Sequence, residues 1–129
     1  MKKLTKPING KLTSKFGERV HPVTKVKGFH NGIDIAAPVG TPVLAPADGK
    51  ITELFDSEKG GLCMALETPD GTRFGFAHLS KRYAAWNEPV AQGQHIAASG
   101  NTGRTTGPHL HFTVKQNGDW IDPLTMFKY

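Results

Sequence analysis

The stretch Gly107–Phe112, which reads Gly-Pro-His-Leu-His-Phe, decides the fold that the sequence predicts. His109 and His111 alternate with Leu110 and Phe112, and this period of two is typical of a β-strand with one apolar face. The other face then carries two imidazoles, which are common zinc ligands and proton carriers. Strands also carry histidines that have no chemical role, so the pair alone does not show whether this strand contributes to a metal or catalytic site.

The composition extends the β pattern to the whole chain. The 129 residues include 15 glycines and 9 prolines, spread along the sequence, and no long segment has a clear apolar period of 3.6 residues. This combination favours an all-β or mostly β fold with many turns, and the length fits one domain. Residues 1–13 are predicted as a polar lead-in and residues 14–129 as the domain.

Turn signals divide the chain into short strands. Asp48–Gly49 predicts a β-hairpin that leads into a strand at residues 51–55. A second hairpin turn is predicted at residues 69–72, between strands at residues 62–67 and 73–79.

Three other segments lack strand signals. Residues 17–23 are predicted as a loop, in which His21 is a loop residue and not a ligand. Residues 80–86 are predicted as a helical turn or a loop. Residues 99–107 form a glycine-rich loop that runs directly into the two histidines, so we expect it to line their site.

His78 ends the strand predicted at residues 73–79. Strand alternation puts it on the same face as Phe74 and Phe76. A histidine on an apolar face is most often a satisfied core residue, so the local pattern favours a structural role for His78 over a chemical one.

The charge pattern bears on partners. Lys and Arg outnumber Asp and Glu by 16 to 11, but they are scattered and do not alternate with aromatic residues. Nucleic-acid binding is therefore not expected, whereas a polyanionic wall polymer fits the charge. No apolar run follows the basic residues at the start, which predicts neither a usual signal peptide nor membrane insertion. Cys63 is the single cysteine, so no intrachain disulfide is expected.

Separate segments of the chain offer ligands for a metal ion. The candidates are His30, Asp34, His78, His109 and His111. A catalytic zinc takes three nitrogen or oxygen ligands from the protein and leaves a position for water, and two histidines with one aspartate meet that need. The spacing alone is chemically sensible but does not identify the site.

Several motifs in the same order resemble the lysostaphin-type, LytM-like zinc endopeptidases of peptidase family M23. The similar segments span most of the chain: Phe16–Val23, His30–Pro38, Ala77–Ser80, Ser99–Gly103, Gly107–Phe112 and Ile121–Leu124. The resemblance implies a two-sheet antiparallel β architecture with zinc on the floor of a groove. It also implies hydrolysis of a peptide bond in bacterial peptidoglycan.

The resemblance assigns roles to individual residues. His30, Asp34 and His111 match the metal ligands, and His78 and His109 match two unliganded histidines beside the metal. Zinc lowers the pKa of a bound water and polarises a carbonyl. Because no His-Glu-x-x-His motif supplies a glutamate base, His109, His78 or both are expected to move the proton.

The same resemblance bears on the substrate. Arg19 is predicted to meet a substrate carboxylate, and Asn31 is predicted as a second substrate-binding residue. Relatives that cut glycine bridges often carry a tyrosine just before the first ligand, and residues 16–29 contain none. We therefore expect a monomeric endopeptidase that acts on peptide stems and cuts the D-Ala–meso-diaminopimelate bond.

Two alternatives and the route of delivery remain open. One alternative is a LytM-like regulator that activates a wall amidase without catalysis, although such relatives usually lack zinc ligands. The other is a sugar phosphotransferase carrier of similar architecture, which the ligand pattern does not fit. The protein is expected to act on the cell wall in the periplasm or outside the cell, delivered by a dedicated export system or encoded by a phage.

Overall fold

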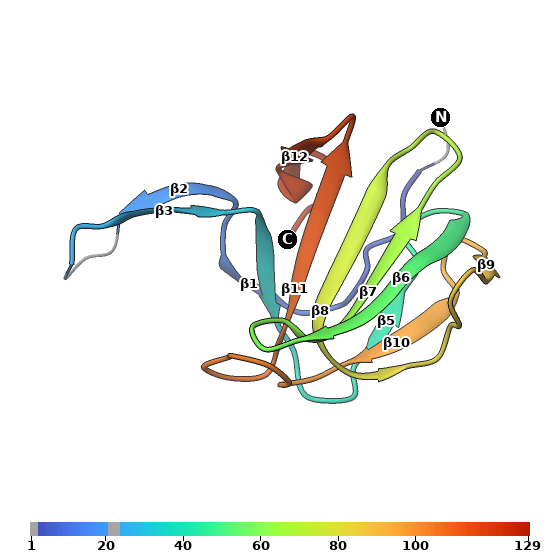
Figure 1. Ribbon diagram of the computed structural model, residues 1–129, viewed down its shortest axis with the longest axis horizontal. Helices are drawn as coiled ribbons and strands as arrows, with labels where there is room; N and C mark the ends of the chain where they lie inside the picture. Colours follow the sequence, from blue (N-terminus) through green and yellow to red (C-terminus); the bar gives the residue numbers. More distant parts are fainter. Residues whose placement is uncertain (1–2, 21–23) are drawn as a thin grey trace.

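The computed structural model describes residues 3–20 and 24–129, and these residues form antiparallel β-structure (Figure 1). The described elements are β1 (Lys11–Ser14), β2 (Gly17–Val20), β3 (Lys27–His30), β4 (Gly32–Ala36), β5 (Pro42–Leu44), β6 (Gly49–Ser57), β7 (Gly61–Glu67), β8 (Arg73–Arg82), β9 (Pro89–Val90), β10 (His95–Ser99), β11 (His109–Gln116), β12 (Asp119–Ile121) and the 3₁₀ helix η1 (Pro123–Thr125). The prediction of an all-β antiparallel fold is confirmed. Within the described part, no helix has the length and apolar character that a membrane span needs.

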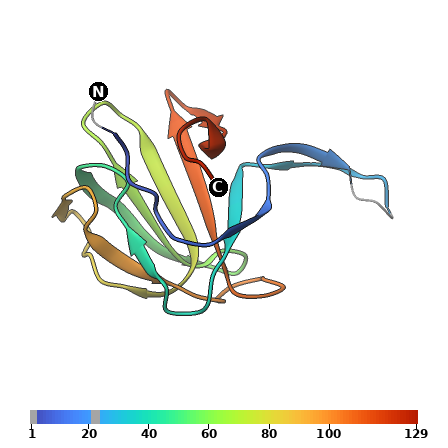
Figure 2. The ribbon, with the colours of Figure 1, turned by 180° about the vertical axis from the view of Figure 1, so that it is seen from behind.

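The strands form one large sheet and one small one. The large sheet has the order β1-β4-β11-β8-β7-β6-β9, and β10 joins it by pairing with both β8 and β5. In Figure 1, β5 and β10 lie across one end of the long strands. The small sheet is the β2–β3 hairpin, which projects from the rest of the molecule in both ribbon views (Figures 1 and 2). We call this hairpin the arm.

Alternating apolar residues on the central strands make the core. On β11, Leu110, Phe112 and Val114 are fully buried. The Phe112 ring lies 5.4 Å from that of Phe76 and 5.9 Å from that of Phe74, measured between centroids. Burial of these large rings contributes about 2–3 kcal/mol each and holds β8 against β11.

The lead-in also contributes to the core. Ile8 is only 2% exposed, and its carbonyl accepts a hydrogen bond of 2.6 Å from the Tyr129 hydroxyl. The Lys6 ammonium lies 4.7 Å from the centroid of the Tyr129 ring. The two ends of the chain are therefore held together, while the proposed division between residues 13 and 14 stays a prediction about domain organisation.

Two local predictions were wrong. Residues 17–20 were expected in a loop, but they form β2, because they pair in register with β3. Asp48–Gly49 does not close a hairpin: β5 pairs with β10, whereas β6 pairs with β7 and β9. The long-range partners outweigh the local turn signal here. His21 lies outside the described residues, and its predicted place in a loop is not tested.

Other local predictions fared differently on the next strands. The hairpin predicted at residues 69–72 is confirmed, since β7 pairs directly with β8. The helical turn or loop predicted at residues 80–86 is wrong for its first part, because β8 continues to Arg82. Arg82 lies opposite Ala97 of β10, so pairing with that strand extends β8.

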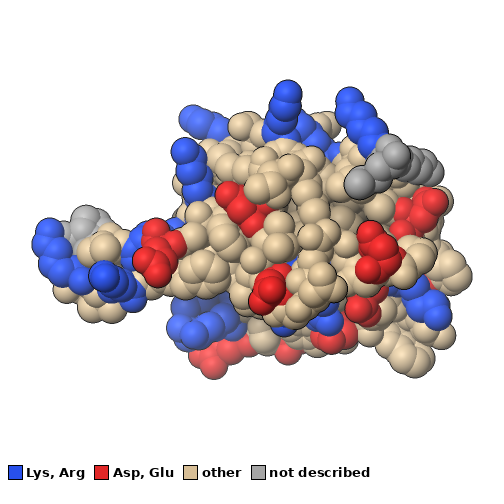
Figure 3. Space-filling model, turned by 90° about the horizontal axis from the view of Figure 1, so that it is seen from above, with Lys and Arg blue, Asp and Glu red and all other residues tan. Residues whose placement is uncertain are grey.

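Charged side chains are distributed over the surface. The face in Figure 3 carries separate basic and acidic groups, and basic groups gather on the projecting arm. Arg19, Lys25 and Lys27 are exposed there. The scattered pattern on the body of the molecule agrees with the scatter along the sequence.

Candidate metal centre

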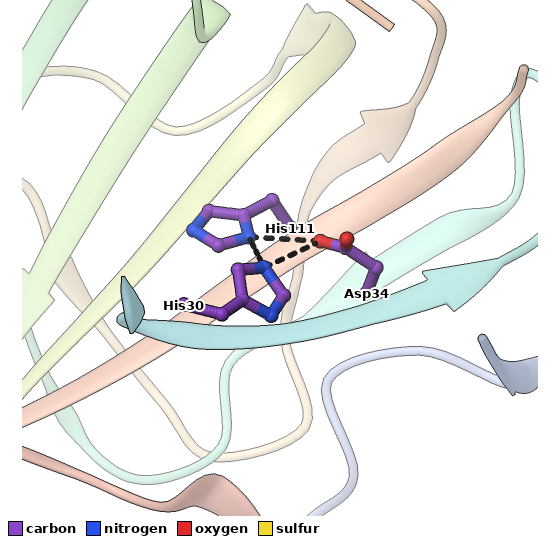
Figure 4. A group of neighbouring side chains, drawn as sticks. All are labelled: His30, Asp34 and His111. Atoms are coloured by element: carbon purple, nitrogen blue, oxygen red, sulfur yellow. Dashed lines mark hydrogen bonds and ion pairs between the residues drawn. The ribbon is translucent and has the colours of Figure 1, made fainter. Parts of the chain in front are cut away.

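Three of the predicted ligands meet at one point, although they are far apart in the sequence (Figure 4). His111 Nδ1 lies 2.8 Å from Asp34 Oδ1, and His30 Nε2 lies 3.4 Å from the same oxygen. The two histidine nitrogens lie 3.3 Å apart. One donor atom of each side chain therefore points to a common centre.

The pairing of β4 with β11 positions two of these side chains. Asp34 lies directly opposite His111 in the register, so both project from the same face of the sheet. Their neighbours Ile33, Ile35 and Phe112 are fully buried on the other face. The sequence patterns Ile-Asp-Ile and Leu-His-Phe thus sort polar ligands from core residues by simple alternation.

The third candidate ligand comes from the arm. His30 is the last residue of β3, and the chain passes through Asn31 into β4. A Cβ at Gly32 would lie 2.2 Å from the carbonyl oxygen of Phe112, so only glycine lets β4 approach β11 this closely. This close approach places His30 over Asp34 and His111.

The donor set fits a tetrahedral metal ion. Zinc–nitrogen and zinc–oxygen bonds of about 2.0–2.2 Å place tetrahedral ligand atoms roughly 3.3–3.5 Å apart. The separations from His30 Nε2, 3.4 and 3.3 Å, match this spacing, and the hydrogen-bonded Asp34–His111 pair is slightly closer. Two imidazoles and one carboxylate are also the donor chemistry that zinc takes in catalytic sites.

Outer hydrogen bonds determine which nitrogen each imidazole presents. His30 Nδ1 lies 2.8 Å from the Lys15 carbonyl, which only accepts, so Nδ1 carries the proton and Nε2 is left for the metal. His111 Nε2 lies 2.9 Å from Asn31 Oδ1. A proton on Nε2 of His111, donated to that oxygen, leaves Nδ1 for the metal.

The electrostatics keep Asp34 ionised. Burial acts to raise the pKa of its carboxyl group, but while the His111 and His30 rings are protonated on both nitrogens, their hydrogen bonds to Asp34 outweigh burial and hold that pKa far below its ordinary value. The hydrogen bond to Asp34 in turn raises the pKa of His30. Asp34 therefore offers an anionic donor that could offset part of the charge of a divalent ion.

Two further histidines lie beside the ligands. The His78 and His109 rings are 4.6 Å apart, and the His78 and His111 rings are 6.4 Å apart. His109 Nδ1 lies 2.8 Å from the Gly107 carbonyl, and His78 Nδ1 lies 2.8 Å from the Thr102 carbonyl. Both rings therefore carry the proton on Nδ1 and have Nε2 available to accept one.

The position of His78 corrects the strand prediction. Phe74 and Phe76 contact Phe112 in the core, whereas the His78 ring lies with His109 on the opposite face. His78 has φ of 63°, in the left-handed region. This backbone turn breaks the alternation, so the face predicted for His78 was wrong, although its side chain is buried and hydrogen-bonded as expected of a satisfied histidine. Burial lowers the pKa of His78, which favours the neutral form of its ring.

A groove runs beside the centre. Ser14, Asp34 and His109 line it, together with the loop residues Thr106–Pro108. The expectation that the glycine-rich loop lines the site is thus confirmed for its last residues. At this groove, His109 Nε2 lies 3.8 Å from Asp34 Oδ1.

The two predicted substrate-binding residues lie at the rim. Arg19, on the arm, donates a 2.6 Å hydrogen bond from Nη1 to Ser14 Oγ. This contact directs the guanidinium towards the groove, since Ser14 lines it. Asn31 is half-buried, and its carboxamide oxygen is engaged with His111. Binding of substrate by either residue stays a prediction.

The sequence interpretation missed the groups that orient the histidines. Lys15 and Thr102 act through their backbone carbonyls, which every residue has, so no side-chain pattern marks them. Ser14 received no functional role from the sequence, and its place in the groove follows from the pairing of β1 with β4. Such contacts depend on which strands become neighbours.

The sequence profile of Peptidase family M23 matches residues 28–123, which include the three candidate ligands and both neighbouring histidines, His78 and His109. The chain belongs to peptidase family M23. The resemblance stated from the sequence motifs is therefore confirmed.

Individual M23 relatives support this assignment. The chain is 42% identical over 118 residues to the DD-carboxypeptidase/endopeptidase Mpg of Neisseria meningitidis, covering 90% of this chain and 27% of that protein. It is 38% identical over 121 residues to the peptidoglycan DD-endopeptidase ShyA of Vibrio cholerae, covering 92% and 28%. The chain thus spans about a quarter of the length of these relatives.

Solved M23 structures share the fold. A zinc-containing peptidase from Vibrio cholerae superposes with a TM-score of 0.89 at 34% identity, covering 99% of this chain and 40% of that one. The catalytic domain of lysostaphin from Staphylococcus simulans gives a TM-score of 0.79 at 35% identity, and each chain is covered to 90%. Both superpositions extend over at least 90% of this chain.

Proposed function

We propose that this M23 domain is a zinc-dependent endopeptidase that hydrolyses peptide cross-links of peptidoglycan. The observation that carries the proposal is the convergence of His30 Nε2, Asp34 Oδ1 and His111 Nδ1 beside two histidines with free Nε2 atoms. When bound there, zinc would supply Lewis-acid polarisation of a carbonyl and a more acidic water. Both effects accelerate the hydrolysis of an amide near neutral pH.

His109 and His78 carry the proton transfer in this proposal. Each ring holds its proton on Nδ1 against a backbone carbonyl, so its Nε2 accepts a proton from the attacking water. The same groups can return a proton to the departing amine. Their rings lie in contact, so both reach one scissile bond.

The rim residues bind the peptide. Arg19 offers a permanent cation for a stem-peptide carboxylate, and its hydrogen bond to Ser14 holds it at the groove. The Asn31 amide N–H groups donate to a substrate carbonyl while its oxygen stays on His111. We assign the cut to the D-Ala–meso-diaminopimelate cross-link, in line with the DD-endopeptidase names of the relatives Mpg and ShyA.

The site of action follows from this substrate. The domain acts on the cell wall as a monomer, in the periplasm or outside the cell. All the residues that line the groove come from one chain, so the proposal needs no second copy at the site.

Mass spectrometry of muropeptides tests the proposal. Sacculi with meso-diaminopimelate cross-links, digested with the zinc-loaded protein, should lose cross-linked dimers and gain monomers, and a chelator should stop the change. The matched control is the His111→Ala variant. A protein that binds zinc but releases nothing from several wall types would overturn the proposal and favour a non-catalytic regulator. Release at another bond would overturn only the assigned specificity.

A further inference from the structure

We infer that Thr102 is a positioning residue, whose hydroxyl locks the loop that orients His78. The inference rests on the proposed hydrolysis, because it concerns the orientation of one of the two proton carriers. Thr102 does not line the groove with Ser14, Asp34 and His109. It acts on the reaction through the His78 imidazole alone.

The pairing of β7 with β8 shifts in register near His78. Leu62 lies opposite Leu79, and Met64 lies opposite Phe76. Two residues of β8, one of them His78, therefore face a single residue of β7. This is a β-bulge, and the left-handed backbone at His78 belongs to it. The bulge turns the His78 ring to the metal face.

The side chain of Thr102 closes this bulge by hydrogen bonding to both strands. The Thr102 hydroxyl donates to the Leu79 carbonyl at 2.6 Å and accepts from the Leu62 N–H at 3.1 Å. These two backbone groups belong to facing residues of β7 and β8. The side chain of Thr102 thus bridges them at the end of the bulge, from a loop that is distant in the sequence.

The backbone of Thr102 also contacts the His78 imidazole. The carbonyl of Thr102 accepts the hydrogen bond from His78 Nδ1, at 2.8 Å. The same residue therefore fixes both the backbone next to His78 and the tautomer of its ring. His109 needs no such device, because its Nδ1 partner is Gly107, only two residues away.

The loop around Thr102 is packed against the turn before β7. The Arg104 N–H donates to the Lys59 carbonyl at 2.9 Å, and the His78 N–H donates to the Gly60 carbonyl at 2.7 Å. A Cβ at Gly103 would lie 2.4 Å from the Gly61 nitrogen. This packing allows Thr102 a single position, so the hydroxyl and the carbonyl act together.

Substitution of the hydroxyl tests the inference. Thr102→Val keeps the shape but leaves the Leu62 N–H and the Leu79 carbonyl without their partner, and Thr102→Ser restores the hydroxyl. We expect Thr102→Val to lower kcat on a cross-linked muropeptide by about tenfold, with KM and zinc content within about twofold of wild type, and Thr102→Ser to regain most of the loss. Thr125→Val is the matched control, since its hydroxyl bonds Asp122 at a remote turn.

A double-mutant cycle shows whether Thr102 acts through His78. In a His78→Ala background, Thr102→Val should change kcat by less than about twofold. An equal tenfold loss in both backgrounds would overturn the inference, as would full activity of the single variant. If Thr102→Val fails to fold, Gly103→Ala displaces the same loop and should give the same dependence on His78. An inactive wild-type protein would instead contradict the proposed hydrolysis itself.

Discussion

Strand β11 and the end of β8 lie side by side and place their histidines by different means. On β11, His109 and His111 share a face because the strand is regular and His111 pairs directly with Asp34. At the end of β8, His78 shares that face only because a bulge with a left-handed residue reverses the alternation. One histidine pair follows from a simple repeat, and the third histidine follows from an irregularity.

The two strands show that a regular backbone fixes the spacing of two side chains, whereas a bulge can bring a third side chain closer. A regular strand fixes two side chains about 7 Å apart along its length and cannot bring a third one nearer. The bulge shifts β8 by one residue and turns His78 towards His109, to a ring separation of 4.6 Å. The left-handed conformation costs about 1–2 kcal/mol for a residue with a side chain, and histidine is among the residues that adopt it most readily.

Loss of a ligand should have the largest effect. We expect His30→Ala and His111→Ala to lose bound zinc and to lower kcat/KM by more than about a thousandfold, because two ligands do not hold a catalytic zinc firmly. Zinc per protein, measured by elemental analysis after dialysis, checks the result. His95→Ala is the matched control, since His95 is exposed beside Tyr83. Full zinc content in His111→Ala would remove β11 from the metal centre.

Loss of either proposed proton carrier should lower catalysis without affecting zinc binding. His109→Ala and His78→Ala should keep zinc and lower kcat by about 10²- to 10⁴-fold each, because a positioned base supplies an effect of that size. Turnover of a defined muropeptide dimer and zinc content are measured on the same samples. Normal hydrolysis by His109→Ala at full zinc occupancy would contradict its assigned role.

Glycine substitutions should distinguish the two backbones directly. At position 78 the left-handed conformation favours Gly over Ala by about 1 kcal/mol in free energy of unfolding. At position 109, in a regular strand, Ala should be more stable than Gly by about 0.5–1 kcal/mol. Urea unfolding of the four variants in the presence of a chelator measures both differences. If the difference in free energy of unfolding between the Gly and Ala variants had the same sign at both positions, the bulge would be absent in solution.

The chain ends offer a test that should leave both strands unaffected. Burial raises the pKa of Tyr129 to about 12. The folded state therefore holds the phenol proton more tightly than the unfolded state, whose pKa is near 10. This contribution is fully present below pH 10 and is lost as the pH rises to 12, a decrease of about 1 kcal/mol after solvent screening.

The Tyr129 prediction is checked by urea midpoints between pH 9 and pH 12. Tyr129→Phe should lack this part of the decrease, although it loses the hydrogen bond to Ile8 at every pH. If the two proteins lose stability in parallel, other groups cause the decrease. Zinc content at pH 8 should be the same in both.

Prediction from the sequence succeeded where the neighbours of a residue are set locally. The all-β fold and the turn at residues 69–72 followed from alternation and turn residues. The failures involve long-range partners. The hairpin expected at Asp48–Gly49 is replaced by pairing of β5 with β10, and the loop expected at residues 17–20 is a strand of the arm. Local propensity is too weak to decide such pairings.

The sequence by itself determined the chemistry that this protein carries. It set the residue types of the centre, and the period of two in Gly107–Phe112 put His109 and His111 on one face, because successive side chains of a strand point to opposite sides. Only the tertiary structure decided that His78 joins them. Its direction depends on a bulge, which arises when β7 and β8 pair out of step and Thr102 closes the gap from a distant loop. The alternation within β8 predicts the other face for His78, and only the likeness of Ala77–Ser80 to the M23 motif indicated its place.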